Sequence, residues 1–283
     1  MKKYILLLLL PSIVLTSCGG NQEEKKESSE ADTSAAADTS AAPVDEIVDF
    51  KFHVYLANIP SPFETIYELS KVKAPFNNNL INKLENESKY ITSSKKALNY
   101  GVYGVDLAYL ATNEQFKELP KYLKTTRNIA NSLNTAESFD KIVGKRMESN
   151  WENKDTITRL MDEAFQATDE YLSSNQRQLI AIQILTGGWV ESQNILFSVM
   201  KDIEKNVKYD NIYRILNEQR FHLKSITELL TKYDNKSELK GLIAKMSALN
   251  EEFQKTNNET MIEKKKLAEL SSKIGEIRAM IIN

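Results

Sequence analysis

Apolar residues recur at intervals of three and four along most of the chain beyond residue 61, and this spacing predicts amphipathic helices. The clearest run extends from Ile157 to Leu172, and a second extends from Ile212 to Tyr233. The predicted helices are 62–72, 88–112, 113–133 with a kink or restart at Pro120, 136–148, 154–173, 175–204, 209–233, 237–255 and 261–282. The pattern therefore predicts an all-α fold, either a multi-helix bundle or a helical array.

Helix-starting motifs support three of these boundaries. Ser61, Pro62 and Glu64 form a capping box, in which the serine caps the helix and the glutamate reaches back to it. Similar boxes are predicted at Thr112 with Gln115 and at Ser173 with Gln176.

The last two predicted helices carry apolar residues at heptad spacing. The two halves stay in phase, which allows one long helix over 237–282, whereas Asn257 and Asn258 favour a break and a helical hairpin. The stripe either packs onto the protein's own bundle or forms a coiled-coil interface with a partner. Its residues are Leu242, Met246, Leu249, Phe253, Leu267, Leu270, Ile274, Ile277 and Ile281.

Two different segments precede the helices. Residues 47–56 alternate apolar and polar side chains, which predicts one short strand that either lies across helices or pairs with another segment. Residues 18–46 are mostly small or acidic, and 31–36 repeats as 37–42. This composition cannot bury enough apolar surface to offset the entropy of ordering, so we expect a flexible acidic tether before an all-helical domain over 47–283.

Residues 1–17 match a lipoprotein signal peptide. A basic start precedes an apolar run that is too short to span a bilayer, and residues 15–18 form a lipobox that ends in Cys18. We expect cleavage before Cys18, a diacylglyceryl group on its thiol, and acylation of the new amine by a fatty acid such as palmitate. Residues 21–24 resemble an acidic surface-export signal, which favours the outer membrane over the inner one and display at the cell surface.

Composition excludes several classes of function. Cys18 is the only cysteine, so the predicted domain has no disulfide, no cysteine-based metal site and no thiol nucleophile. The chain carries 37 basic and 39 acidic residues, without the basic surplus that nucleic-acid binding requires. The expected partners are the membrane, through the lipid, and a protein or a small ligand. No cofactor is expected.

Two predicted helices contain glycines beside a large aromatic residue and an acid. They hold Gly101, Tyr103, Gly104 and Asp106 in one case, and Gly187, Gly188, Trp189 and Glu191 in the other. Each glycine costs a helix about 1 kcal/mol relative to alanine, so another interaction must compensate. One interpretation is a close helix crossing, in which each acid bonds a tyrosine hydroxyl or a basic side chain. The other is a ligand pocket walled by Tyr103 and Trp189, with Asp106 and Glu191 as its polar groups.

Catalytic motifs are weakly represented in the sequence. The two histidines, His53 and His222, lack metal-ligand spacing, and no phosphate loop or nucleophile elbow occurs. The acid pairs 162–163 and 169–170 point in different directions around a helix, so we expect them on solvated surface. We therefore expect a protein that is not an enzyme. A hydrolase that uses Asp106 and Glu191 as a carboxylate pair is a remote alternative.

A resemblance rests on three stretches of the chain. Residues 59–62 with Glu64, 97–99 with 101–107, and 187–189 with Glu191 resemble a group of uncharacterised lipoproteins and secreted proteins of Bacteroidetes. The resemblance implies an all-helical fold and an envelope location, without an activity. The expected function is that of an envelope lipoprotein that binds a ligand or partner non-enzymatically. The alternative is a structural or accessory subunit of an envelope complex that uses the C-terminal heptad helices.

Overall fold

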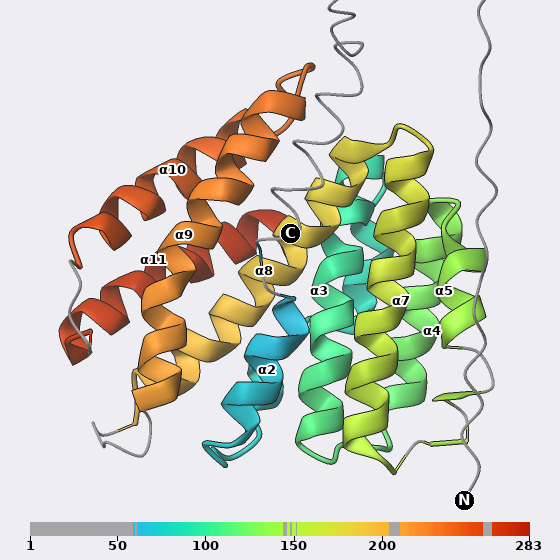
Figure 1. Cartoon of the computed structure of the whole chain (residues 1–283), viewed down its shortest axis with the longest axis horizontal. Helices are drawn as coiled ribbons and strands as arrows, with labels where there is room; N and C mark the ends of the chain where they lie inside the picture. The colour runs from blue at the N-terminus through green and yellow to red at the C-terminus, as the bar shows by residue number, and fades with distance from the viewer. Residues whose placement is uncertain are drawn as a thin grey trace, which may run out of the picture. The chain divides into compact units, whose positions relative to one another are not determined.

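The computed structural model describes residues 59, 61–143, 146–147, 149–150, 152–203, 210–256 and 262–283. These residues form an all-α domain, as the apolar pattern predicts (Figure 1). Its α-helices are α2 (Pro62–Ser70), α3 (Ser93–Thr112), α4 (Leu119–Ser132), α5 (Ala136–Ile142), α7 (Lys154–Ser174), α8 (Gln178–Met200), α9 (Asp210–Tyr233), α10 (Lys240–Gln254) and α11 (Lys264–Ile282). Two 3₁₀ helices, η1 (Asn78–Leu80) and η2 (Leu84–Lys89), precede α3.

The predicted signal peptide, Cys18, the tether and the 47–56 strand lie outside the described residues. Across the described ranges, no helix combines the length and the apolar content needed to cross a membrane.

Helices α3 and α8 form the centre of the domain and make its most extensive contact between helices. Nearly every residue of α3 from Ala97 onward is buried, and so is nearly every residue of α8 from Ala181 to Phe197. Both helices are buried on all sides, mostly through apolar residues, which is the pattern of a helix enclosed by others. Helices α2, α4 and α7 pack on α3, while α2, α9 and α11 pack on α8 (Figure 1).

Bare backbone at two glycines, Gly101 and Gly187, allows α3 and α8 to cross closely. A Cβ at Gly101 would lie 2.0 Å from the carbonyl oxygen of Ile184 and 2.5 Å from the amide nitrogen of Gly188. A Cβ at Gly187 would lie 1.8 Å from the carbonyl oxygen of Leu98. Real Cβ atoms do not approach backbone so closely, so only glycine fits at these two positions. The close packing of α3 on α8 therefore offsets the cost in helix stability that Gly101 and Gly187 bring.

Several helix ends agree with the sequence. Ser61 caps α2 by accepting a hydrogen bond from the N–H of Phe63 at 3.3 Å, and Pro62 is the first helical residue. Helix α4 restarts with Pro120 in its first turn. Helix α3, in contrast, begins at Ser93 rather than 88, because the Thr92 hydroxyl caps it by accepting from the N–H of Lys95 at 3.1 Å.

The capping boxes predicted at Thr112 and Ser173 are wrong. Both residues lie in the last turn of a helix, and the Thr112 hydroxyl donates to the Ala108 carbonyl at 2.9 Å. Glu114 and Gln176 follow with left-handed backbone, at φ values of 60° and 56°. A left-handed residue at this position ends a helix, so the local signal belonged to a C-terminus and not to a start.

The C-terminal helices form an antiparallel hairpin. The Lys245 ammonium pairs with Glu276 at 2.7 Å, and the Lys266 ammonium pairs with Glu252 at 2.7 Å. All nine heptad residues are buried, and α11 packs on α8. The apolar stripe is thus used inside the domain and offers no apolar surface to a partner.

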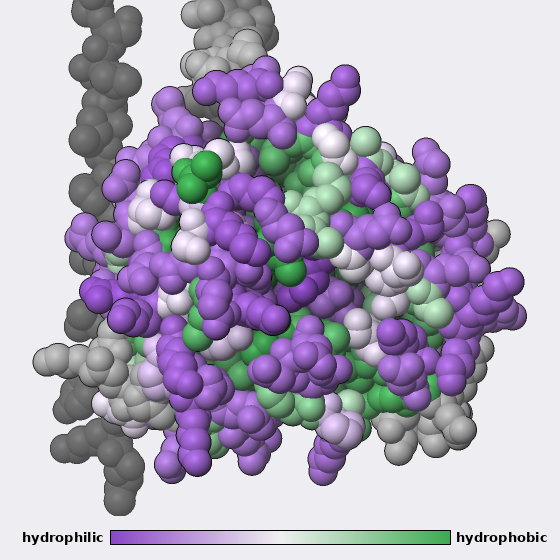
Figure 2. Space-filling model, turned by 180° about the vertical axis from the view of Figure 1, so that it is seen from behind, coloured by the Kyte–Doolittle hydropathy of each residue, from purple (hydrophilic) through white to green (hydrophobic). Residues whose placement is uncertain are grey.

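The surface of the domain is largely hydrophilic on the face shown in Figure 2, with apolar side chains visible between the polar ones. Ile91 and Phe221 are the most exposed large apolar residues among those described, at 81% and 56%. Ile91 lies in the connection between η2 and α3, whereas Phe221 lies in α9.

Candidate functional site

The two acids singled out by the sequence meet in the core of the domain. Asp106 of α3 and Glu191 of α8 are both fully buried, and they lie close enough for the charge of Glu191 to act on Asp106. Arg278 of α11 completes the group, because its Nε lies 2.5 Å and its Nη2 2.7 Å from the two Glu191 oxygens. This bidentate pair is the strongest geometry available to a carboxylate and a guanidinium.

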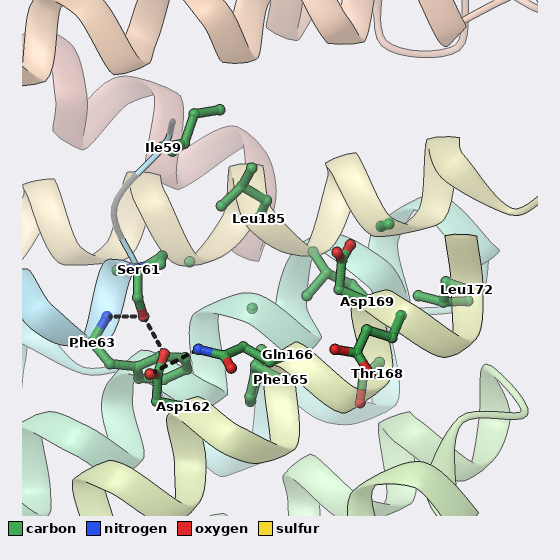
Figure 3. A pocket seen from close by; sticks show the side chains of 16 residues that line it. Ile59, Ser61, Phe63, Asp162, Phe165, Gln166, Thr168, Asp169, Leu172 and Leu185 are labelled. Carbon is green, nitrogen blue, oxygen red and sulfur yellow. Dashed lines mark hydrogen bonds between the residues drawn. The ribbon is translucent and has the colours of Figure 1, made fainter. Parts of the chain in front are cut away.

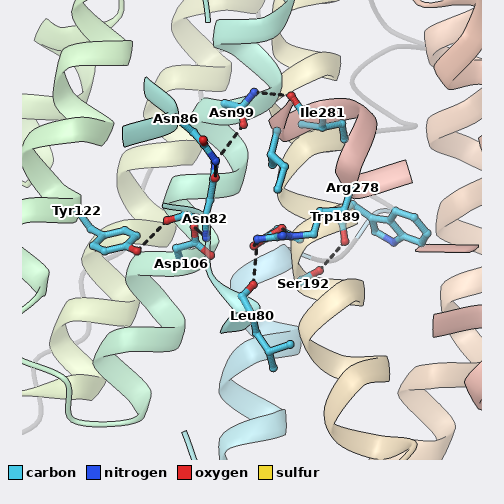
Figure 4. A network of polar contacts seen from close by, with 12 residues as sticks. Leu80, Asn82, Asn86, Asn99, Asp106, Tyr122, Trp189, Ser192, Arg278 and Ile281 are labelled. Atoms are coloured by element: carbon cyan, nitrogen blue, oxygen red, sulfur yellow. Dashed lines mark hydrogen bonds and ion pairs between the residues drawn. The ribbon is translucent and has the colours of Figure 1, made fainter. Parts of the chain in front are cut away.

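The loop between the two 3₁₀ helices closes over this group (Figure 4). The N–H of Asn82 donates to Asp106 Oδ2 at 3.0 Å, and Arg278 Nη2 donates to the Leu80 carbonyl at 3.0 Å. The Tyr122 hydroxyl donates to the Asn82 carbonyl at 2.8 Å. One buried polar cluster, which we call the Asp106 cluster, therefore joins five parts of the chain: α3, α4, α8, α11 and residues 80–82.

Burial raises the pKa of Asp106 well above its usual value, and the neighbouring Glu191 carboxylate raises it further, while Arg278 opposes both effects. Among the described residues, Asp106 Oδ1 has no hydrogen-bond partner. A neutral Asp106 fits this burial, since the cluster would otherwise hold two carboxylates against one guanidinium. The cluster then carries one negative and one positive charge, which is the balance that a buried site requires.

Both aromatic residues of the predicted pocket belong to the packed core. Trp189 Nε1 donates to Gln219 Oε1 of α9 at 3.0 Å, and the Tyr103 hydroxyl donates to the Lys83 carbonyl at 2.7 Å. The ring of Tyr103 packs on Tyr90 and Tyr122. The pocket expected between Tyr103 and Trp189 is therefore replaced by packed side chains.

A cleft of about 560 Å³ opens elsewhere on the same helix pair, between α2, α3, α7 and α8 (Figure 3). Gly101 and Gly188 lie in its wall, whereas Asp106 and Glu191 do not. Gly104 is not among the lining residues, and a Cβ there would meet the ring of Phe165 at 2.1 Å. The other lining residues are Ile59, Ser61, Pro62, Phe63, Asp162, Phe165, Gln166, Thr168, Asp169, Glu170, Leu172, Ala181, Ile184 and Leu185.

One face of α7 supplies the charge of this cleft. Residues 162, 165, 166 and 169 are spaced by three and four, so a single helical face presents Asp162, Phe165, Gln166 and Asp169. The prediction that the acid pairs are merely solvated was wrong for Asp162 and Asp169, which are half-buried and line the cleft. They flank the apolar stripe of α7, and this border position is the signal that could have identified them.

The Asp162 carboxylate is held in place by its neighbours. The Ser61 hydroxyl donates to its Oδ1 at 2.6 Å, and Gln166 Nε2 donates to its Oδ2 at 3.1 Å. The same serine caps α2, so the start of α2 and the middle of α7 are tied together at one end of the cleft.

His222 lines a smaller recess of about 160 Å³ between α2 and α9, together with Glu64, Glu68 and Glu218. Burial lowers the pKa of His222, which is consistent with a histidine at the border of the core. Within the part of the chain that the structure describes, no group of three or more histidine, cysteine or acidic side chains is arranged to hold a metal ion.

The fold and the cleft define an all-α domain with a cavity of ligand size. Comparisons with family models, curated proteins and solved structures found no match to this chain.

Proposed function

We propose that this protein is a lipid-anchored envelope protein whose helical domain binds a small molecule, without chemical conversion, in the cleft between α2, α7 and α8. The observation that carries the proposal is the cleft itself. Its volume of about 560 Å³ falls within the range of small-molecule sites, about 300 to 1,000 Å³. Apolar side chains with a few polar groups at the edge are the usual lining of such sites.

The walls of the cleft favour a preformed site. Gly101 and Gly188 belong to the α3–α8 crossing, whose backbones touch and cannot separate without loss of packing. Phe165 stacks on the buried Tyr100 ring at 4.6 Å between centroids and meets Phe63 edge-on at 4.9 Å. A ligand would thus find rigid walls and would lose little affinity to ordering the site.

A matched pair of substitutions tests the cleft. Leu185→Trp places a larger side chain in the cleft, while Ile91→Trp adds similar bulk at a position that is 81% exposed and is not among the lining residues. The full-length protein is extracted from membranes in non-ionic detergent and examined by native mass spectrometry. We expect one small molecule bound to the wild type and to Ile91→Trp, and none bound to Leu185→Trp at an unchanged melting temperature. An empty wild type, or equal occupancy of both variants, contradicts the proposal.

The anchor is proposed from the sequence. The lipobox at residues 15–18 supports acylation of Cys18, with the outer membrane as the favoured location. Two or three acyl chains hold a protein firmly at a membrane, whereas one chain holds it marginally. Cys18→Ala is expected to move the protein from the membrane fraction to the soluble fraction, and continued sedimentation with membranes would contradict the anchor.

Two other functions that the sequence allows, a hydrolase and an accessory subunit, find no support in the structure. A hydrolase would need a substrate to reach Asp106 and Glu191, but both carboxyl groups are fully buried and neither lines the cleft. An accessory subunit would need the heptad stripe as its interface, but that stripe packs on the domain's own helices. We therefore propose neither.

A further inference from the structure

We propose that the surface formed by residues 89–96, 236–241 and 279–283, which we call the Ile91 surface, docks on the anionic headgroups of a lipid bilayer. The contact rests on the proposed function, whose lipid anchor would hold the domain within reach of a membrane. It goes beyond the cleft, because it fixes which side of the domain faces the bilayer.

Side chains at the start of α3 hold the last turn of α11. Lys95 Nζ donates to the Met280 carbonyl at 2.7 Å and to the Ile281 carbonyl at 3.2 Å. Asn99 Nδ2 also donates to the Ile281 carbonyl, at 3.0 Å (Figure 4). The last carbonyl groups of a helix have no partner within the helix, so these bonds join the two segments into one surface.

The turn between α9 and α10 borders the same surface. The Ser94 hydroxyl donates to Glu238 Oε2 at 3.0 Å. A Cβ on Gly241 would lie 3.5 Å from Met280 Cε, which is an ordinary van der Waals distance. The start of α10 therefore packs beside the end of α11, and residues 236–241 complete the surface.

Apolar side chains are exposed on the Ile91 surface. Ile91 is the most exposed large apolar residue among those described, and Met280 is 39% exposed. Ile282 is half-buried in the same turn of α11 as Met280. Isolated apolar side chains are common on protein surfaces, so the charge around them must identify the partner.

Lysines predominate among the charged side chains of this surface. Its five lysines are Lys89, Lys95, Lys96, Lys236 and Lys240. Glu238 is the one acidic side chain of the three segments, and a carboxylate at Asn283 would still leave the balance positive. Lys89, Lys236 and Lys240 are exposed, and within the described part of the chain none of the three pairs with an acid.

Acids that flank the three segments are mostly engaged with other groups. Glu87 accepts hydrogen bonds from two side chains of α4, and Asp234 accepts from two N–H groups just before α10. Glu276 pairs with Lys245. Glu85 is exposed and opposes one lysine at most, so the surface keeps its positive balance.

Exposed apolar side chains among lysines fit the interface of an anionic bilayer. The negative headgroups attract ammonium groups that come within a Debye length of them. Long lysine stems reach the headgroups while an apolar neighbour enters the boundary with the acyl chains. An acidic protein would neutralise the lysines but would also need a pocket for Ile91, whereas a bilayer accommodates both features.

A spin label at position 91 tests the contact. Cys18 is the only cysteine and acylation would block its thiol, so Ile91→Cys gives the anchored protein one reactive thiol. Phe221→Cys is the matched control, because it places the same label at an exposed apolar position in α9. The full-length protein is extracted from membranes and reconstituted in vesicles of phosphatidylcholine, with or without phosphatidylglycerol.

Electron paramagnetic resonance measures how often each label collides with a neutral, water-soluble nickel chelate. We expect the label at position 91 to be shielded from the chelate in vesicles that contain phosphatidylglycerol and to be accessible in phosphatidylcholine alone. The label at position 221 should be accessible in both. Equal accessibility of the two labels, or equal shielding of position 91 in both kinds of vesicle, would overturn the proposal.

Charge variants test the lysines. Lys89→Gln combined with Lys240→Gln should lower the ratio of docked to undocked protein about thirtyfold, or about 2 kcal/mol, for two lysines near an anionic leaflet. The control combines Lys121→Gln with Lys224→Gln, since these lysines are exposed outside the Ile91 surface and pair with acids of their own helices. An equal loss of docking in both double variants would contradict a specific surface.

Labelling of the wild type separates this proposal from the anchor. Uptake of the spin label by the wild type would show that Cys18 is not acylated, and the anchor of the proposed function would fail. The Ile91 surface is then judged by sedimentation of the wild type and of the Lys89→Gln, Lys240→Gln variant with phosphatidylglycerol vesicles. Weaker sedimentation of the variant would support the surface, and equal sedimentation would overturn it.

Discussion

The α3–α8 pair borders two regions that contain acids of the same kinds but treat them in opposite ways. In the Asp106 cluster, two carboxyl groups are sealed in the core, burial raises the pKa of Asp106, and Glu191 pairs with Arg278. In the cleft, Asp162 and Asp169 are half-buried, and Asp162 accepts hydrogen bonds from Ser61 and Gln166. A sealed acid must be neutralised inside the protein, whereas water still reaches a half-buried acid and can stabilise its charge. The degree of burial therefore separates the acids of the core from the acids that border the cleft.

The largest expected effect comes from breaking the ion pair of the sealed region. Glu191→Gln should lower the free energy of unfolding by about 3 kcal/mol, because Arg278 loses its carboxylate partner inside the core. Urea denaturation measures the change. Asp106→Asn is the matched control, and its free energy of unfolding should stay within about 1 kcal/mol of the wild type, since the amide has the shape of the protonated carboxyl group. Equal losses in both variants would contradict a proton on Asp106.

The next largest loss of stability is expected at the α3–α8 crossing, which both regions border. Gly187→Ala should lower the free energy of unfolding by about 2 kcal/mol, because the new Cβ would meet the Leu98 carbonyl oxygen at 1.8 Å and force the helices apart. Gly275→Ala in α11 is the control. No atom lies within 4 Å of a Cβ there, so the variant should gain up to about 1 kcal/mol in helix propensity. Thermal unfolding of the two variants checks the difference, and similar melting temperatures would refute the close crossing.

The pH dependence of stability distinguishes a sealed acid from an exposed one. The pKa of Asp106 is raised in the folded protein, so this state keeps a proton that the unfolded chain releases above about pH 4. Stability should therefore fall as pH rises from about 4 toward the folded pKa, with a slope approaching 1.4 kcal/mol per pH unit, about one proton. The measurement is the difference in free energy of unfolding between the wild type and Asp106→Asn across this range. If the free energies of unfolding of the wild type and Asp106→Asn change with pH in parallel, Asp106 does not carry a proton in the folded protein.

The smallest expected effect lies at the rim of the cleft. Ser61→Ala removes the cap of α2 and one donor to Asp162, and it should cost about 1 kcal/mol. Thr92→Ala removes the cap of α3 away from the cleft and should cost a similar amount. Urea denaturation measures both losses, and an unchanged free energy of unfolding in Ser61→Ala would contradict the cap of α2.

The presence of most helices could be predicted from the sequence, because it depends on the spacing of apolar residues by three and four along a short stretch of chain. The stripes of α7 and α9 and the restart at Pro120 all rest on residues within a few turns of one another. The boundaries at Thr112 and Ser173 failed because a hydroxyl residue near a helix end occurs both before a start and within a last turn. Only the left-handed Glu114 and Gln176 decide which end it is.

The candidate site was predicted only in part. The glycines marked the right helix pair, and Gly101 and Gly188 do line the cleft. The acids that face the cleft were missed, although their place beside the α7 stripe was visible. Arg278 was also missed, although it follows Ile277 at the edge of the buried heptad stripe, where a basic side chain can reach the core.

The sequence by itself determined the all-α class, the helices with a clear period of three and four, and the two glycine-bearing helices at the centre. Each of these follows from neighbours along the chain. Only the tertiary structure decided that Arg278 neutralises Glu191 and that Asp162 and Asp169 face a cleft. Both depend on which helices pack together, and the charge state of an acid is set by what surrounds it in space rather than by its neighbours in sequence.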